Sequence, residues 1–375
     1  MAGRSTAPER SATDVLIVGA GPCGLAAAVA ARRAAFRATV VERGCVVSGI
    51  ASYPTYLTFF STAEKLAIGD VPFVVAAEKP TRRDALAYYR AVVSHYDLDV
   101  RQYETVVEIA ALSGAPGERP AGGPPPTSNV PSAHRASAIE SAPPQARFRI
   151  RSVTRAGDER HTDARAVVIA TGYFGSPNRL DAPGEDLAHV THLYGEGHEA
   201  FRRRAVVVGG GNSAVEAVLD LHHSGAHVTL VHFGPTFDRT IKPWVLPTIE
   251  ARFASGEIGV RWNARVVEIT PHEVVLATET GSERIAADHV YLMLGYLPEV
   301  GLLRGLGVPI DPETGIPRHD PATMETPVPG LFIAGVIASG YDANKTFIEN
   351  GRFHGDLIAR RLVAEGQAIE NPSPS

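Results

Sequence analysis

One pattern occurs twice in this sequence: an apolar strand, a glycine-rich turn and an apolar helix, at residues 15–28 and again at 206–219. In each copy the first glycine permits a tight turn, the second lets the backbone approach a pyrophosphate, and a small third residue lets the helix pack closely on the strand. The pyrophosphate then lies at the helix N-terminus, where free N–H groups and the helix dipole favour negative charge. Two copies predict two nucleotide cofactors. The residues concerned are Gly19, Gly21, Pro22 and Gly24 in the first copy and Gly209, Gly211, Asn212, Ser213 and Ala214 in the second.

The residue that follows the second strand of each unit predicts which nucleotide is bound. In the first unit the strand 38–41 ends in Glu42, where an acidic side chain hydrogen-bonds the ribose of an unphosphorylated nucleotide. This favours FAD; the alternative is that Glu42 only marks a solvated strand end. In the second unit no carboxylate follows the strand 227–231. The basic side chains of the next loop favour NADPH over NADH, unless they only solvate that loop; they are His232, Arg239 and Lys242.

Composition sets limits on the class of protein. A chain of 375 residues with 44% apolar and 21% charged side chains can bury a sizeable core, and we expect two domains. The net charge of −5 offers no basic stripe for nucleic acid, and the apolar runs are too short to cross a membrane. The N-terminus lacks the apolar core of a signal peptide, so we expect a cytoplasmic protein. With only Cys23 and Cys45, neither a disulfide framework nor a cysteine-rich metal site is expected.

Two further apolar strands, within 166–172 and 330–335, run into turns of small residues. In flavoproteins that bind two dinucleotides, the backbone passes close to FAD at such turns, and bulky side chains would obstruct it. One strand precedes the second glycine motif and the other follows it. Both ends of the chain are therefore predicted to form one FAD domain, with an NADPH domain inserted. The predicted FAD contacts in these turns are Thr171, Gly172 and Gly335.

The segment 111–146 is rich in Pro, Gly, Ser and Ala and lacks the large apolar residues that a core requires, which predicts a disordered insertion. The flanking segments 106–109 and 147–153 alternate like the two arms of a hairpin, so the insertion replaces a turn within one domain. The predicted α/β organisation comprises a disordered tail at 1–13, an FAD domain at 14–195 and 313–375, and an NADPH domain at 196–312.

Longer stretches resemble a known family. The arrangement is similar to that of flavoproteins with the low-molecular-weight thioredoxin-reductase architecture, and within them the chain resembles the YpdA family, the bacillithiol disulfide reductases. The resemblance implies tightly bound FAD, NADPH as the electron donor, and an oxidised low-molecular-weight thiol such as bacillithiol disulfide as substrate. A homodimer is common for this architecture. The stretches are GAGPCGLAAA (19–28), SYPTYLTFFSTAEKLAIGDVPFV (52–74), KPTRRDALAYYRAVV (79–93), IKPWVLP (241–247) and AGVIASGYDANKTFIENGRFHG (334–355).

Neighbouring enzyme classes match less well. Thioredoxin reductases of this architecture carry a CxxC pair in the NADPH domain, and this chain has no cysteine after Cys45. Glutathione-reductase-like enzymes carry CxxxxC, but Ile50 stands where the second cysteine would be. The motif of flavin monooxygenases fails at 186–194. A flavin-dependent monooxygenase or oxidase, and a ferredoxin- or flavodoxin-type NADP reductase, remain the alternative functions.

Two segments are predicted to lie beside the flavin ring. The stretch 52–61 is dense in aromatic and hydroxyl side chains, although core packing would also explain the aromatic ones. The stretch 340–349 predicts a helix with Asp342 as its N-cap, whose positive end would face the ring and stabilise negative charge on it. Lys345 would add a cation there, or lie on an exposed first turn. The flavin-side candidates are Thr58, Phe59, Ser61, Asp342 and Lys345.

Cys23 lies inside the first glycine turn, at the start of a helix whose dipole is expected to lower the pKa of a thiol. The resemblance implies that this cysteine is catalytic and forms a mixed disulfide with the substrate. The alternative is a small buried residue with a structural role. Cys45 has no counterpart in the family and is interpreted as structural.

Overall fold

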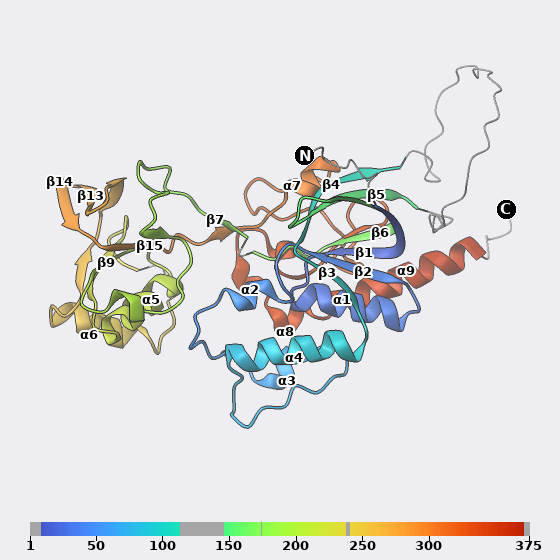
Figure 1. The fold of residues 1–375 in the computed structure, drawn as a ribbon, viewed down its shortest axis with the longest axis horizontal. Helices are drawn as coiled ribbons and strands as arrows, with labels where there is room; N and C mark the ends of the chain where they lie inside the picture. Colours follow the sequence, from blue (N-terminus) through green and yellow to red (C-terminus); the bar gives the residue numbers. More distant parts are fainter. Residues whose placement is uncertain (1–8, 113–145, 174, 238–240, 371–375) are drawn as a thin grey trace, which may run out of the picture. The chain divides into compact units, whose positions relative to one another are not determined.

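The fold is taken from a computed structural model that describes residues 9–112, 146–173, 175–237 and 241–370. The described residues form two compact units (Figure 1). The first unit combines those of 1–48, 60–173 and 298–375, and the second those of 49–59 and 174–297. These limits differ from the predicted domain limits at 196 and 312. The second unit starts earlier because β7 (Ser176–Pro177) pairs with β16 and β8 (Val190–Thr191) pairs with a strand of its sheet, and it ends at Leu297, the last residue of β16.

The first unit is built on a seven-stranded sheet in the order β3-β2-β1-β6-β5-β4, with β17 beside β6. Strands β1, β2, β3, β6 and β17 are parallel, whereas β4 and β5 form an antiparallel extension. The strand segments that helices cover are apolar, as at 15–18 in β1 and 166–169 in β6, whereas β3 and the first halves of β1 and β6 carry polar side chains. The strands are β1 (Glu9–Val18), β2 (Ala38–Glu42), β3 (Asp99–Gln102), β4 (Glu104–Ala111), β5 (Phe148–Thr154), β6 (Glu159–Ile169) and β17 (Leu331–Ile333).

The start of β1 corrects one prediction. Residues 9–13, expected in a disordered tail, extend β1 and pair with β6 in register from Glu9↔Arg160 onward. Polar side chains hold this extension: the Ser11 hydroxyl lies 3.0 Å from that of Thr162, and the Thr13 hydroxyl donates to the Arg37 carbonyl at 2.9 Å. Composition alone misses such a strand because its partners are far away in sequence. Residues 1–8 lie outside the described residues.

The predicted hairpin is confirmed. Strands β4 and β5 pair antiparallel from Glu104↔Thr154 to Ala111↔Phe148. The backbone N–H of Leu112 continues the pairing by donating to the Arg147 carbonyl at 2.7 Å. The insertion predicted between them lies outside the described residues except at its two ends.

Helices of the first unit pack closely because they meet through small residues. Figure 1 shows α1 and α9 side by side, and their contact is made possible by Gly355, whose Cβ position would lie 2.7 Å from the Cα of Ala27. Helix α4 begins with a capping box in which Thr81 and Asp84 bond each other's backbone. The helices are α1 (Pro22–Arg33), α3 (Ala63–Leu66), α4 (Arg82–His95), α7 (Gly301–Gly305), α8 (Ile348–Gly351) and α9 (His354–Glu370), with 3₁₀ turns at Gly335–Ser339 and Ala343–Lys345.

The second unit repeats this plan on a smaller scale. Its five-stranded parallel sheet has the order β11-β10-β9-β15-β8, and helix α5 (Asn212–His223) packs on it. A three-stranded antiparallel sheet, β12-β13-β14, and the pair β7-β16 complete it. The remaining bounds are β7 (Ser176–Pro177), β9 (Arg204–Val208), β10 (His227–Val231), β11 (Gly259–Arg261), β12 (Arg265–Ile269), β13 (Glu273–Thr278), β14 (Gly281–Ala286), β15 (His289–Leu292), β16 (Tyr296–Leu297) and α6 (Leu246–Ala254), with α2 (Ser48–Ala51) at the chain limit between the units.

Across the part of the chain that the structure describes, no helix combines the length and apolarity needed to span a bilayer.

The tight packing of α1 against the turn before it generates a stability prediction. A Cβ atom at Gly24 would lie 2.0 Å from the carbonyl oxygen of Gly19, and that backbone oxygen cannot move aside cheaply. We expect Gly24→Ala to lower the free energy of unfolding by about 2–3 kcal/mol. Gly49→Ala, where no atom lies within 4 Å of the Cβ position, is the matched control. Urea denaturation compares the two, and equal midpoints would contradict the packing described.

Candidate dinucleotide-binding sites

In the first glycine turn, a Cβ atom would collide with backbone at the first and third glycines, whereas the middle glycine faces open space. Gly19 has a φ of +109°, and a Cβ there would lie 2.4 Å from the Ala170 carbonyl oxygen. Gly24 is equally crowded, as described above. Between them, Gly21 has no atom within 4 Å of its Cβ position and serves as the N-cap of α1, and Pro22 begins the helix. The turn therefore leaves a backbone cradle at the helix N-terminus, of the kind that receives a pyrophosphate.

The two other turns meet this cradle at the same edge of the sheet. The Ala170 N–H donates to the Val18 carbonyl at 2.8 Å, and the Ala334 N–H donates to the Ile169 carbonyl at 2.9 Å. Thr171, Gly172 and Gly335, predicted as FAD contacts, follow directly in the chain. The Thr171 hydroxyl is buried with no hydrogen-bond partner among the described residues, and no atom lies within 4 Å of the Gly172 Cβ position. A buried hydroxyl and the open Gly172 position fit a bound dinucleotide.

Glu42 is buried at the end of β2, where the sequence predicts a ribose contact. One carboxylate oxygen accepts from the Ala20 N–H at 2.8 Å, and the other accepts from the Gly44 N–H at 2.7 Å and the Ser48 hydroxyl at 2.9 Å. The bond to Ala20 ties Glu42 to the glycine turn. Since a carboxylate oxygen has two lone pairs, the oxygen facing Ala20 can also accept a ribose hydroxyl.

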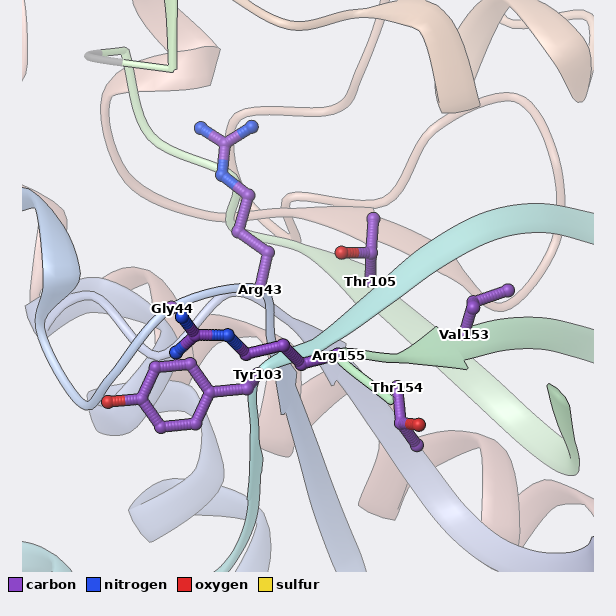
Figure 2. A pocket seen from close by; sticks show the side chains of 7 residues that line it. All are labelled: Arg43, Gly44, Tyr103, Thr105, Val153, Thr154 and Arg155. Atoms are coloured by element: carbon purple, nitrogen blue, oxygen red, sulfur yellow. The ribbon is translucent and has the colours of Figure 1, made fainter. Parts of the chain in front are cut away.

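A pocket of about 480 Å³ lies beside Glu42 in the first unit and was not predicted from the sequence (Figure 2). Figure 2 shows the Arg155 guanidinium folded over the ring of Tyr103, 5.6 Å from its centroid, while Arg43 points away from them. The Arg43 guanidinium forms an ion pair with Glu299 at 3.3 Å. The lining residues come from distant segments, so only the fold brings them together; they are Arg43, Gly44, Tyr103, Thr105, Val153, Thr154 and Arg155.

Cys23, the candidate catalytic residue, is enclosed by glycines. A Cβ at Gly351 would lie 2.8 Å from its sulfur, and one at Gly335 would lie 3.1 Å from it. Burial, and next the charge of Glu349, raise the pKa of Cys23 to about 12. The expectation that the helix dipole lowers this pKa is therefore wrong, because desolvation of the thiolate and a nearby carboxylate outweigh the dipole. The catalytic role itself stays a prediction.

The candidates from the stretch 52–61 lie in different surroundings. The Ser61 hydroxyl hydrogen-bonds the carboxylate of Glu349 within the first unit, close to Cys23. Thr58 is exposed in the second unit, and Phe59 is half-buried there with its ring 6.3 Å from that of Tyr53. Their place beside a flavin stays a prediction.

The segment that begins at Asp342 corrects another prediction. In place of one helix capped by Asp342, a 3₁₀ turn ends at Lys345, and helices begin later, at Ile348 and His354. The break arises because Phe347 is extended, with a ψ of −175°, and its N–H donates to the Asn350 side chain at 2.8 Å. Asp342 and Lys345 form an exposed ion pair of 3.7 Å.

His354 at the start of α9 reaches the cradle. Its Nδ1 accepts a hydrogen bond of 3.1 Å from the Gly335 N–H, which fixes the ring. Burial, and next the neighbouring His319, lower the pKa of His354 to about 4, so the ring is neutral at pH 7.

The second glycine turn repeats the geometry of the first. Gly209 has a φ of +144°, and a Cβ there would lie 2.3 Å from the Met293 carbonyl oxygen. Gly211 is the N-cap of α5, Ala214 is fully buried and Ser213 is exposed on the first helical turn. The Asn212 side chain accepts from the Lys242 N–H at 2.9 Å, which anchors the following loop to α5.

Of the three basic residues predicted to select NADPH, the structure describes two, and these lie in different surroundings. His232 is 4% exposed, and a Cβ at Gly210 would lie 2.3 Å from its ring, so the imidazole covers the glycine turn. The Lys242 ammonium forms an ion pair of 2.8 Å with Glu216 on α5. Arg239 lies outside the described residues.

Comparisons with known proteins agree with this geometry. The family described as pyridine nucleotide-disulphide oxidoreductase matches residues 16–115 and 140–335. The Bacilliredoxin reductase Bdr of Bacillus subtilis is 41% identical over 93% of this chain and 97% of its own length. The solved Bacillithiol Disulfide Reductase Bdr (YpdA) from Bacillus cereus is 40% identical, covers 95% of this chain and 100% of its own, and superposes with a TM-score of 0.83. Its counterpart from Staphylococcus aureus is 36% identical, with 95% and 99% covered and a TM-score of 0.81. The resemblance inferred from the sequence is confirmed.

The open cradle generates a binding prediction. Because no protein atom lies near the Cβ position of Gly21, Gly21→Ala should fold normally, but its methyl group should occupy the space that a pyrophosphate needs. We expect the purified variant to retain less than about a tenth of the wild-type FAD content. Gly305→Ala, equally open but distant in sequence from the turn, should keep it. A yellow Gly21→Ala protein with full FAD would contradict the assignment of the cradle.

The lowered pKa of His354 generates a pH prediction. Its ordinary value is 6.5 and its value in the folded chain is about 4, so the neutral ring is the form that the fold favours. The stability that this ring contributes is therefore present above pH 6.5 and is lost as the pH falls toward 4. His354→Asn keeps an acceptor for the Gly335 N–H and removes the titration. Thermal melts between pH 7 and 4 should show a shallower decline for the variant, and parallel declines would refute the shift.

Proposed function

The chain belongs to the pyridine nucleotide-disulphide oxidoreductase family and, within it, to the Bdr (YpdA) reductases, and on that premise we propose that it reduces bacillithiol disulfide or a related low-molecular-weight disulfide with electrons from NADPH. Two complete strand–glycine–helix units support the two cofactors, and the similarity to the Bdr (YpdA) reductases supports the disulfide substrate. Such a chain is an oxidoreductase with FAD and NADPH as its cofactors.

The first unit is proposed to hold FAD. The pyrophosphate would lie against Gly21 at the N-terminus of α1, with the ribose hydroxyls toward Glu42. Thr171, with its buried hydroxyl unsatisfied by described residues, would donate to or accept from the cofactor. The absence of side chains at Gly172 and Gly335 would let the cofactor lie close to the backbone.

The pocket beside Glu42 is proposed to take the adenosine end of the same cofactor. Its position supports this, because Arg43 and Gly44 directly follow the ribose-binding glutamate and the Tyr103 N–H donates to the Gly44 carbonyl at 3.0 Å. The Tyr103 ring and the guanidinium planes offer flat surfaces on which a base can stack.

The chemistry combines a cofactor with one thiol of the chain. FAD, when bound, accepts a hydride from NADPH and supplies the two electrons that a disulfide needs. We propose Cys23 as the thiol that meets the substrate: its sulfur attacks one sulfur of the disulfide, the S–S bond breaks, a mixed disulfide forms and the first thiol leaves. Two electrons and two protons would then cleave the mixed disulfide, release the second thiol and restore the Cys23 thiol. Because the raised pKa keeps Cys23 protonated at rest, its proton must be lost as it attacks, and the departing thiolate takes that proton up; the charge of Glu349 opposes this loss.

The proposal extends to the oligomeric state, the location and a further electron acceptor. We propose a homodimer, which is common for this architecture, and a cytoplasmic location. The name of the Bacillus subtilis relative, Bacilliredoxin reductase Bdr, points to bacilliredoxin as a further acceptor to test.

Anaerobic oxidation of NADPH tests the proposed function. We expect rapid oxidation with bacillithiol disulfide and none with buffer alone. Cys23→Ser should lower the turnover of disulfide by at least about 100-fold without changing flavin reduction by NADPH, because only the second half-reaction needs the thiol. Cys45→Ser is the matched control and should leave both steps intact.

Three outcomes would contradict parts of this account. Flavin reduction that stalls until oxygen is admitted would favour a monooxygenase or oxidase. Reduction that stalls until ferredoxin or flavodoxin is added would favour an NADP reductase of that kind. A Cys23→Ser enzyme with turnover within twofold of wild type would remove the thiol step and leave the substrate assignment standing.

A further inference from the structure

We infer that Arg265, at the start of β12, is the residue that binds the 2′-phosphate of NADPH and so selects NADPH over NADH. The inference rests on the proposed function in one respect, that a nicotinamide dinucleotide binds the second unit. Arg265 is far from the glycine motif and from β10 in sequence, and the fold alone brings it to the ribose position.

The backbone places Arg265 beside the end of β10. The His232 N–H donates to the Arg261 carbonyl at 2.9 Å, the Asn263 N–H donates to the Gly234 carbonyl at 3.0 Å, and the Ala264 N–H donates to the His232 carbonyl at 3.0 Å. These bonds lock the segment before β12 along the residues that follow β10. That is the position at which dinucleotide-binding units read the ribose 2′ substituent.

The side chain of Arg265 is held but remains available. Its guanidinium carbon lies 4.9 Å from the centroid of the Phe233 ring, in a cation–π contact that fixes its plane. Both residues are exposed, Phe233 at 59%. Among the described residues no carboxylate forms an ion pair with Arg265, and Glu283, an acidic residue on β14 of the same three-stranded sheet, is bonded to Arg261 at 2.8 Å. A stacked guanidinium with its donors unoccupied suits a phosphate.

The two predicted basic residues that the structure describes fit this role less well. His232 is buried over Gly210, and Lys242 is paired with Glu216 beside α5. His232 and Phe233 stand where an NADH-binding unit carries an acidic residue. The ribose position therefore lacks a carboxylate that would repel a phosphate, and Arg265 supplies the positive charge.

Calorimetric titration of the FAD-loaded enzyme with 2′,5′-ADP (adenosine 2′,5′-bisphosphate) and with 5′-AMP tests the inference without any disulfide. These nucleotides differ only at the ribose 2′ position. We expect the wild type to bind 2′,5′-ADP at least about tenfold more tightly than 5′-AMP, and Arg265→Met to lose about 10- to 100-fold in affinity for 2′,5′-ADP only. Arg284→Met is the control, because Arg284 is exposed on the same three-stranded sheet and pairs with Glu273.

Phe233→Leu tests the cation–π contact between Phe233 and Arg265. It removes the ring and keeps apolar bulk, so the affinity for 2′,5′-ADP should fall, and it should fall no further when Phe233→Leu is added to Arg265→Met. Additive losses in the double variant would show that the ring does not act through Arg265.

The outcomes separate this inference from the proposed function. Equal binding of the two nucleotides by the wild type, or unchanged discrimination in Arg265→Met, would overturn the inference and leave a disulfide reductase with another basis for choosing its donor. Strong discrimination that depends on Arg265, in an enzyme that reduces none of the disulfides offered, would support the inference and refute the proposed substrate.

Discussion

The closeness of α1 to the turn that precedes it is the constraint on which the site depends. The Cβ that Gly24 lacks would lie 2.0 Å from the Gly19 carbonyl oxygen, so the helix N-terminus is pressed against the end of β1. That closeness leaves the Gly21 position facing open space at the edge where β1, β6 and β17 all end. Thr171, Gly172 and Gly335 follow two of those strands and therefore meet the same cradle. If α1 packed less closely on the turn, it would still cover the sheet, but its N-terminal N–H groups would not converge on the cradle.

The second unit has the same kind of glycine turn but different side chains at the ribose position. Glu42 is fixed by the N–H groups of Ala20 and Gly44, and its negative charge suits a ribose with free hydroxyls. At the equivalent place after β10 the imidazole of His232 is buried, and the exposed charge comes from Arg265. A negative side chain at the ribose position of the first unit and a positive one in the second favour different nucleotides. A reductase needs this difference, because NADPH must not bind in the site of FAD.

Features that depend on short-range sequence patterns could be predicted from the sequence, and features that depend on contacts between distant segments could not. The two glycine turns, the order of strands around them and the hairpin of β4 and β5 follow from short-range spacing, and the structure contains all of them. Residues 9–13 pair with β6, about 150 positions away, so composition misread them as a tail. The helix expected at Asp342 breaks because Asn350 caps Phe347, and the pKa of Cys23 rises because Gly335, Gly351 and Glu349 surround it. Arg155 and Arg265 reach their sites only through the fold.

The central claim is that the enzyme stores electrons on its flavin alone and passes them to a disulfide without a resident dithiol, since its two cysteines, Cys23 and Cys45, are both free. An anaerobic titration of the FAD-loaded enzyme with NADPH measures this directly, by the flavin absorbance and the equivalents consumed. We expect complete flavin reduction with about one NADPH per bound FAD. A requirement for about two NADPH per FAD would reveal a second two-electron centre in the chain and contradict the account.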